Sequence, residues 1–205
     1  MRPVLVILAG GRASRMGGGD KGLRPFAGGT MIGRILERLD GQASRIAINA
    51  NGDPARHAGF GLPVIADSVS GQPGPLAGVL AGMEWADAQV PEADDIVTVP
   101  ADTPFVPRDL VDRLLAARQR DGAQIAVAES AGQRHPVAAL WPLRLQGELR
   151  RSITRDGARR VDRWMGLYRV AAAEFAAAPV DPFFNVNFPE ELAEAERLAQ
   201  AFPDA

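Results

Sequence analysis

The 205-residue chain contains no cysteine, so a disulfide framework, a thiolate nucleophile and a thiolate metal site are all excluded. It also lacks an apolar run long enough to cross a bilayer, because the first such run, at residues 3–8, passes at once into a glycine-rich loop. The net charge of −2 gives no general attraction to nucleic acid or to acidic membranes. We therefore expect a cytoplasmic protein whose partners are neither nucleic acid nor membrane.

Lysine is nearly absent as well, since Lys21 stands alone against 22 arginines. A composition rich in arginine, alanine, glycine and proline explains why arginine replaces lysine on the surface, but it does not explain why one ammonium is kept in the stretch RMGGGDKG at 15–22. Lysine is a compact point charge with rotatable donors, which suits a phosphate group that moves during transfer. Lys21 is thus predicted to bind phosphate, and a solvated loop charge is the plain alternative.

The apolar pattern alternates between strand-like and helix-like segments. Strands are expected at 3–8, 45–50, 62–66, 95–99, 124–128 and 135–141, and helices at 30–39, 76–85, 107–119 and 143–153, with a terminal helix after Asn187. This alternation predicts an α/β protein with a three-layer, Rossmann-like fold, in which a mostly parallel sheet carries helices on both faces. We expect a single domain over 1–205, with a nucleotide-binding half at about 1–130 and an acceptor-binding half at about 131–205.

The loop after the first strand is the usual phosphate cradle of such a sheet, and two familiar loop types can be excluded there. The phosphate-binding loop of NTPases places its lysine between a glycine and a Ser or Thr, whereas Lys21 lies between Asp20 and Gly22. The dinucleotide pattern G-x-G-x-x-G is formally present at 17–22. It begins well beyond the strand, however, and Pro25 blocks the helix that the pattern requires.

Candidate site residues gather where predicted strands end. In the loop, Arg15 and Lys21 would neutralise triphosphate charge beside glycines that let backbone N–H groups approach phosphate. Asp102 follows a buried strand within PADTP, where its carboxylate could hold Mg²⁺ or simply initiate a turn. Asn49 and Asp67 follow the second and third strands, so both should reach the same rim and meet a base or ribose.

Motifs along nearly the whole chain point to one family. In order, they are LAGGRASRMGGGDKGL from Leu8, NAN at 49–51, IADS around Asp67, PGPLAG from Pro73, PADTPF from Pro100, HP at His135, GARRV from Gly157 and NVNFPEEL from Asn185. Together they resemble the molybdenum cofactor guanylyltransferases, which are nucleotidyltransferases. The resemblance implies transfer of GMP from GTP to molybdopterin or its molybdenum-loaded form, with Mg²⁺ and release of pyrophosphate.

The same resemblance implies roles for particular residues. The nucleotide-contacting positions would be Leu8, Ala9, Gly10, Lys21, Asn49, Asp67 and Asp102. Lys21, Asp102 and Arg15 would be catalytic, with Asp102 as the metal ligand. Proteins that deliver or receive the cofactor would be further partners.

Acceptor binding is expected from the second half of the chain. Asn185 and Asn187 alternate around Val186, so both could offer neutral donors and acceptors to a pterin, although a helix cap explains Asn187 equally well. The basic stretch at 150–163 would meet a phosphate of the acceptor, its plain alternative being a solvated helix face. His57 and His135, the only histidines, receive no role.

Two alternatives stay open. A related nucleotidyltransferase with another base or acceptor, such as a cytidylyltransferase, would share the loop. A non-catalytic GTP-binding chaperone for the cofactor would bind without producing pyrophosphate, and the combination of Lys21 with Asp102 argues against it.

Overall fold

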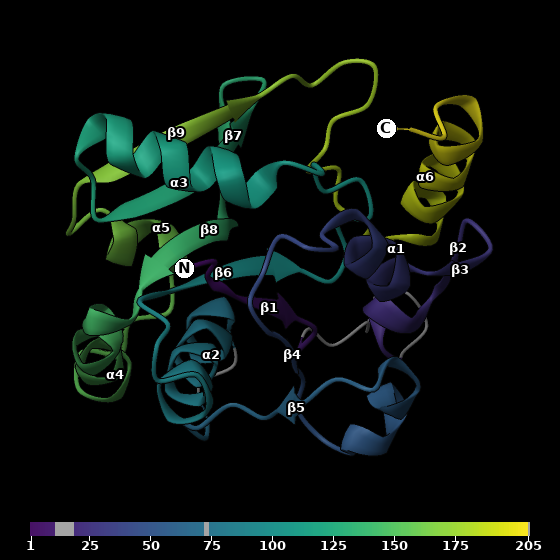
Figure 1. Cartoon of the computed structure of the whole chain (residues 1–205). Helices are drawn as coiled ribbons and strands as arrows, with labels where there is room; N and C mark the ends of the chain where they lie inside the picture. Colours follow the sequence, from purple (N-terminus) through teal and green to yellow (C-terminus); the bar gives the residue numbers. More distant parts are fainter. Residues whose placement is uncertain (11–18, 72–73, 205) are drawn as a thin grey trace.

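The computed structural model describes residues 1–10, 19–71 and 74–204, and its centre is a seven-stranded sheet in the order β5-β4-β1-β6-β8-β7-β9 (Figure 1). The strands are β1 (Val4–Leu8), β4 (Ile46–Asn49), β5 (Val64–Ile65), β6 (Asp95–Pro100), β7 (Ile125–Ser130), β8 (Gln133–Pro142) and β9 (Val170–Phe175). All pairs are parallel except those of β8, which runs antiparallel to β6 and β7. The sheet is therefore mostly parallel, as the sequence predicts.

The strand register determines where a site can form. Leu8, the last residue of β1, pairs with Asn49 of β4 and with Pro100 of β6. Three parallel strands therefore end side by side, and the loops that follow them open onto one edge of the sheet. In open α/β sheets this carboxyl edge is where ligands bind.

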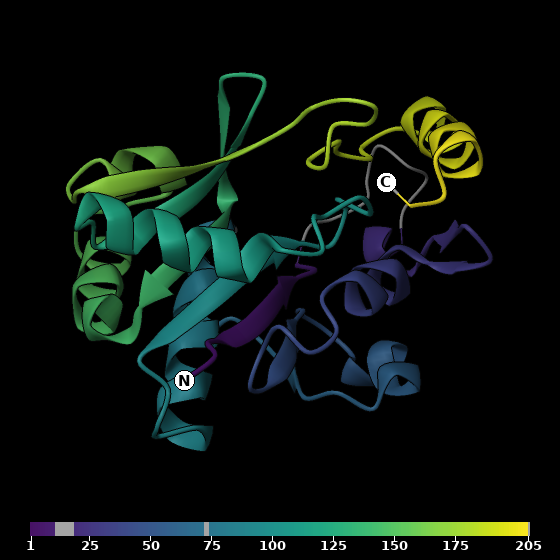
Figure 2. The same cartoon turned by 45° about the horizontal axis from the view of Figure 1, so that its top comes forward.

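Helices cover both faces of the sheet and make three layers (Figures 1 and 2). Helices α1 (Met31–Arg38) and α3 (Leu110–Asp121) pack on the face that carries Leu5 and Ile7 of β1. Helices α2 (Pro75–Gln89), α4 (Gln146–Thr154) and α5 (Val161–Met165) pack on the opposite face, with Val4 and Val6. A strand that is buried on both faces must be apolar throughout, which explains the continuous apolar run of β1.

The last helix, α6 (Pro189–Ala201), lies apart from these layers, beside α1 and the small hairpin of β2 (Pro25–Phe26) and β3 (Gly29–Thr30) (Figure 2). Phe26, Phe105 and Ala195 belong to a third apolar cluster that joins these parts. The C-terminal segment is thereby carried back to the loop that contains Lys21.

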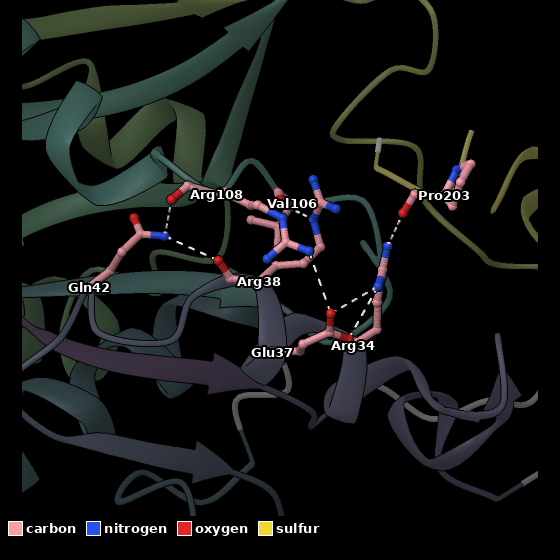
Figure 3. A network of polar contacts seen from close by, with 7 residues as sticks. All are labelled: Arg34, Glu37, Arg38, Gln42, Val106, Arg108 and Pro203. Carbon is pink, nitrogen blue, oxygen red and sulfur yellow. Dashed lines mark hydrogen bonds and ion pairs between the residues drawn. The ribbon is translucent and has the colours of Figure 1, made fainter.

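Helix α1 is also tied to the segment that follows β6, as Figure 3 shows. Arg38 donates from Nε to the Val106 carbonyl at 2.6 Å, and Gln42 donates to the carbonyls of Arg38 and Arg108. Arg34 reaches the Pro203 carbonyl at 2.9 Å. Burial lowers the pKa of Arg38 to about 10, with neighbouring arginines contributing. The network holds the segment after Asp102 against α1.

Several elements differ from the sequence-based expectation. Strand β9, the β2–β3 hairpin and the 3₁₀ helix η3 (Pro54–Phe60) were not predicted, and the helix expected at 143–153 is divided into η4 (Leu143–Leu145) and α4. Asn187 is not the cap of α6. The cap position is Phe188, and the Glu191 carboxylate accepts from the backbone N–H groups of Phe188, at 3.1 Å, and of Asn187. None of the helices within the described residues is long and apolar enough to span a membrane.

Candidate active site

A cavity of about 1000 Å³ opens at the carboxyl edge of the sheet. All seven predicted nucleotide-contacting residues line it, together with Asn185 from the second half of the chain. Its volume lies at the upper end of the usual range for small-molecule sites, so a nucleotide and part of a second substrate fit the same space.

Lys21 forms the centre of a polar cluster in this cavity. Its Nζ donates to Asn187 Oδ1 at 2.6 Å and to Asp102 Oδ2 at 3.3 Å, and the side chains of Lys21 and Asp102 are only 18% and 21% exposed. The Asp102 carbonyl accepts from the Val186 N–H at 2.9 Å, which fixes the segment that carries Asn187. Asn187 thus lies against the turn that carries Lys21.

Asp102 is in an unfavourable position for a charge. Burial raises the pKa of its carboxyl group, and the attraction of Lys21 opposes this only in part. A mostly buried carboxylate is stabilised more by a nearby cation than an exposed carboxylate is, because its surroundings screen the attraction less. The site is therefore suited to a cation at Asp102.

A fixed turn presents Lys21. It begins the 3₁₀ helix η2 (Lys21–Leu23), whose cap Asp20 accepts from the Gly22 N–H at 3.2 Å. Gly22 is buried, and a Cβ there would come within 2.5 Å of Ile32 Cδ1, so a larger residue would push the turn off α1. Glycine at this position lets the lysine turn pack directly on the domain.

Asn49, Asn51 and Asp67 form a second polar cluster, which we call the asparagine rim of the cavity. Asn49 is 2% exposed, and its Nδ2 group donates to the Ile65 carbonyl at 3.1 Å and to Asp67 Oδ1 at 3.0 Å. Asn51 donates to Asp67 Oδ2 at 2.8 Å and accepts from the Asp67 N–H at 2.9 Å. Both asparagines thus orient one carboxylate. Sequence reasoning did not select Asn51, although the paired asparagines of NAN were the available signal.

A third wall comes from β8 and the segment before α6. His135, Phe183 and Asn185 line the cavity there, and the imidazole of His135 stacks on Phe183 with ring centres 4.5 Å apart. Ser130 Oγ donates to Asp181 Oδ1 at 2.8 Å and lies 2.7 Å from His135 Nε2. Burial lowers the pKa of His135, with Asp181 and Glu129 opposing the shift. This wall is therefore aromatic and carries a neutral imidazole near pH 7.

Two other sequence-based expectations concern Arg15 and the basic stretch 150–163. Arg15 lies outside the described residues. No residue of the basic stretch 150–163 lines the cavity, and two of its arginines have acidic partners elsewhere: Arg150 pairs with Glu84 and Arg160 with Asp162.

The donor set fits a hard divalent cation. Within the part of the chain that the structure describes, no group of three or more His, Cys, Asp or Glu side chains could form a protein-only metal site. Magnesium, however, is usually held by one or two carboxylates together with substrate phosphates. The oxygens of Asp102 and Asn187 already hold a cationic group, the Lys21 ammonium, between them. A carboxylate and an amide oxygen at this position match what such a cation requires.

A cavity of this size at the carboxyl edge of a mostly parallel sheet, lined by the Lys21 turn and the mostly buried Asp102 carboxylate, is typical of α/β proteins that bind small molecules. The chain matches the MobA-like NTP transferase domain over residues 5–195, and it belongs to that family.

Curated relatives cover nearly the whole chain. A molybdenum cofactor guanylyltransferase of Rhodopseudomonas palustris (strain BisB5) is 58% identical over 95% of this chain and 92% of its own length. A protein of the same name from Nitrobacter hamburgensis is 51% identical over 95% of this chain and 93% of its own length.

Solved structures share the fold at low identity. Molybdopterin-guanine dinucleotide biosynthesis protein A from Archaeoglobus fulgidus superposes with a TM-score of 0.75 at 20% identity, covering 97% of this chain and 99% of that one. A manganese complex of a Mycobacterium tuberculosis protein gives a TM-score of 0.69 at 19% identity, covering 96% and 99%.

Proposed function

We propose that this chain transfers GMP from GTP to molybdopterin or its molybdenum-loaded form, producing the guanine dinucleotide form of the cofactor and pyrophosphate. The observation that carries the proposal is the cluster of Lys21, Asp102 and Asn187 at the carboxyl edge of the sheet. Its support comes from membership of the NTP transferase family and from relatives of that name at 58% and 51% identity.

Lys21 is proposed to bind the triphosphate. An ammonium has three donors, of which Asp102 and Asn187 engage two in the structure, so one is left for a phosphate oxygen. Its charge offsets the negative charge that grows on the leaving pyrophosphate, and the fixed η2 turn keeps it in place before the substrate arrives. Arg15, in the preceding loop, is proposed as a second positive charge on the phosphates.

Asp102, with Asn187 as its neighbour, is proposed to hold Mg²⁺. When bound there, the cation would offset the negative charge of the phosphate groups. Because burial disfavours the bare Asp102 carboxylate, binding of Mg²⁺ with GTP relieves that cost. The sequence-based expectation that Asn187 binds the acceptor stays a prediction beside this proposal.

Two other parts of the cavity lining would each bind a different substrate. Asp67, oriented by Asn49 and Asn51, can accept hydrogen bonds from ribose hydroxyls or from the exocyclic amino group of guanine. Asn185, together with the stacked His135 and Phe183, offers neutral polar groups and a flat surface to a heterocycle such as a pterin.

In this arrangement the terminal phosphate of the acceptor attacks the α-phosphorus of GTP in line. A new P–O bond forms as the bond to pyrophosphate breaks. No covalent enzyme intermediate is required, because positioning and charge neutralisation supply the acceleration.

The test is an incubation of the protein with GTP labelled in its α-phosphate, Mg²⁺ and molybdopterin. We expect labelled guanine dinucleotide and an equal amount of pyrophosphate. Turnover with CTP in preference to GTP would indicate a cytidylyltransferase, and GTP binding without pyrophosphate would indicate a cofactor chaperone. A cytoplasmic location and exchange of the cofactor with other proteins belong to the same proposal.

A further inference from the structure

His57 is a fully buried imidazole that the proposed chemistry does not use. It lies on η3, is 0% exposed, and places Nε2 2.9 Å from Asp20 Oδ2, whose side chain is itself only 5% exposed. Neither ring nitrogen has an aligned hydrogen-bond partner among the described residues, so the approach to Asp20 is an electrostatic contact.

Its neighbour Arg56 contacts both the Asp20 carboxylate and the asparagine rim, through Asn51. Nη1 lies 3.7 Å from Asp20 Oδ2, while Nη2 donates to the Asn51 carbonyl at 2.6 Å. Asn51 in turn holds Asp67 through two hydrogen bonds. The helix η3 therefore contacts the lysine turn through Asp20 and the proposed base-binding rim through Asn51.

We infer that Arg56 and His57 are positioning residues which hold Asp20, and through Asp20 the turn that presents Lys21. The Asp20 side chain uses Oδ1 to cap η2 and Oδ2 to meet Arg56 and His57. Loss of either partner would free the cap and let Lys21 move relative to Asp102. The inference rests on the proposed function, since its consequence is a correctly placed ammonium for phosphate.

Stability alone gives a weak reason for this arrangement. A buried charge or polar pair is often no more stabilising than apolar side chains of the same volume, because desolvation offsets the attraction. A group that must hold a catalytic charge within a fraction of an ångström does need such a partner, and a displacement of about 1 Å costs up to about 100-fold in rate.

The single lysine provides a direct measurement. An amine-acylating reagent can modify only Lys21 and the N-terminus, and Met1 is 79% exposed, so the N-terminal amine serves as an internal reference in each sample. We compare the unchanged protein with Arg56→Ala and His57→Gln. Arg120→Ala is the matched control, because Arg120 is an exposed arginine paired with Asp121 on α3, away from the cavity.

Without nucleotide, we expect Lys21 to be acylated faster in both variants than in the unchanged protein, relative to the N-terminus. Saturating Mg-GTP should protect Lys21 fully in the unchanged protein and in Arg120→Ala, and less well in the other two. kcat/KM for GTP should fall by about tenfold or more. Arg56→Ala removes a half-exposed side chain, so this arm does not depend on the buried site tolerating change.

Unchanged Lys21 acylation in free Arg56→Ala and His57→Gln would overturn the inference. If Arg56→Ala weakens GTP binding while free Lys21 reacts normally, Arg56 contacts the nucleotide directly and does not position the lysine. Failure of Mg-GTP to protect Lys21 in the unchanged protein would instead overturn the proposed function, so the two failures are distinguishable.

Discussion

Gly78 in α2 offers a sharp test of the site, because it lies against Asn49. A Cβ at Gly78 would sit 2.4 Å from Asn49 Oδ1 and 3.1 Å from Leu8 Cδ2. To bring the first contact from 2.4 Å to 3.0 Å, the asparagine must move by at least about 0.6 Å. Asn49 has no free direction, since it is buried and its Nδ2 group is bonded to Ile65 and Asp67.

The expected change in the free energy of unfolding combines opposing effects of Gly78→Ala. Alanine is favoured over glycine in a helix interior by about 1 kcal/mol. Overpacking a core costs about 1–3 kcal/mol, and weakening the Asn49–Asp67 hydrogen bond about 1 kcal/mol more. The net effect is a loss of about 1–3 kcal/mol, which for a chain of this size lowers the melting temperature by about 3–10 °C.

The matched control is Gly147→Ala in α4. Gly147 is exposed, and a Cβ there would meet only the flexible end of Arg151, at 3.8 Å. The same chemical change should therefore raise stability by up to about 1 kcal/mol. Thermal unfolding and GTP titration decide the matter: Gly78→Ala should also bind GTP more weakly, because Asp67 loses its support. Equal stability of the two variants, with GTP affinity unchanged, would show that Gly78 does not hold Asn49 in place.

Three other predictions concern single side chains. Asp102→Asn should abolish most transfer yet leave the metal-free protein at least as stable near pH 7. Burial raises the pKa of this carboxyl group, so its ionisation destabilises the folded state as pH rises. A lower melting temperature with retained turnover would contradict this. Asn185→Ala should raise the KM for molybdopterin more than that for GTP, as separate titrations would show, and a selective loss of GTP affinity would count against it. Burial lowers the pKa of His135 from 6.5, so the neutral imidazole stabilises the folded state above pH 6.5, and this stability is lost as pH falls through the lowered pKa. The free energy of unfolding measured from pH 7.5 to 5 should therefore depend less on pH in His135→Asn. The same pH dependence in both proteins would rule out this contribution.

Most strands and helices could be predicted because their signals lie in local sequence patterns. The apolar run of β1, the buried strand β6 and the periodic helices each follow from side chains that are close in sequence. Strand β9 escaped because its residues, VAAAEF, include three alanines, which have little preference for strands, and only pairing with β7 fixes it. Each strand of the β2–β3 hairpin has only two residues, which is too short for a periodic sequence signal.

The meeting of candidate residues could be expected where strand ends bring them together, but not where it depends on contacts between segments that are distant in sequence. Asn49 and Asp67 follow neighbouring parallel strands, so their meeting could be expected. The contact of Lys21 with Asn187 joins residues 166 positions apart, and no spacing in the sequence indicates it. Asn187 instead resembled a helix cap, a role taken by Glu191, which frees its side chain for Lys21.

Contact between the Lys21 ammonium and the triphosphate can be measured by graded acylation, because Lys21 is the sole lysine of the chain. Samples modified to increasing extents, in the presence and absence of Mg-GTP, are mapped by peptide mass and assayed for guanine dinucleotide formation. We expect activity to fall in proportion to Lys21 modification and to reach zero when modification is complete, and we expect saturating Mg-GTP to prevent both. Full acylation of Lys21 with transfer activity retained would instead show that this lysine is only a loop charge that does not act on the triphosphate.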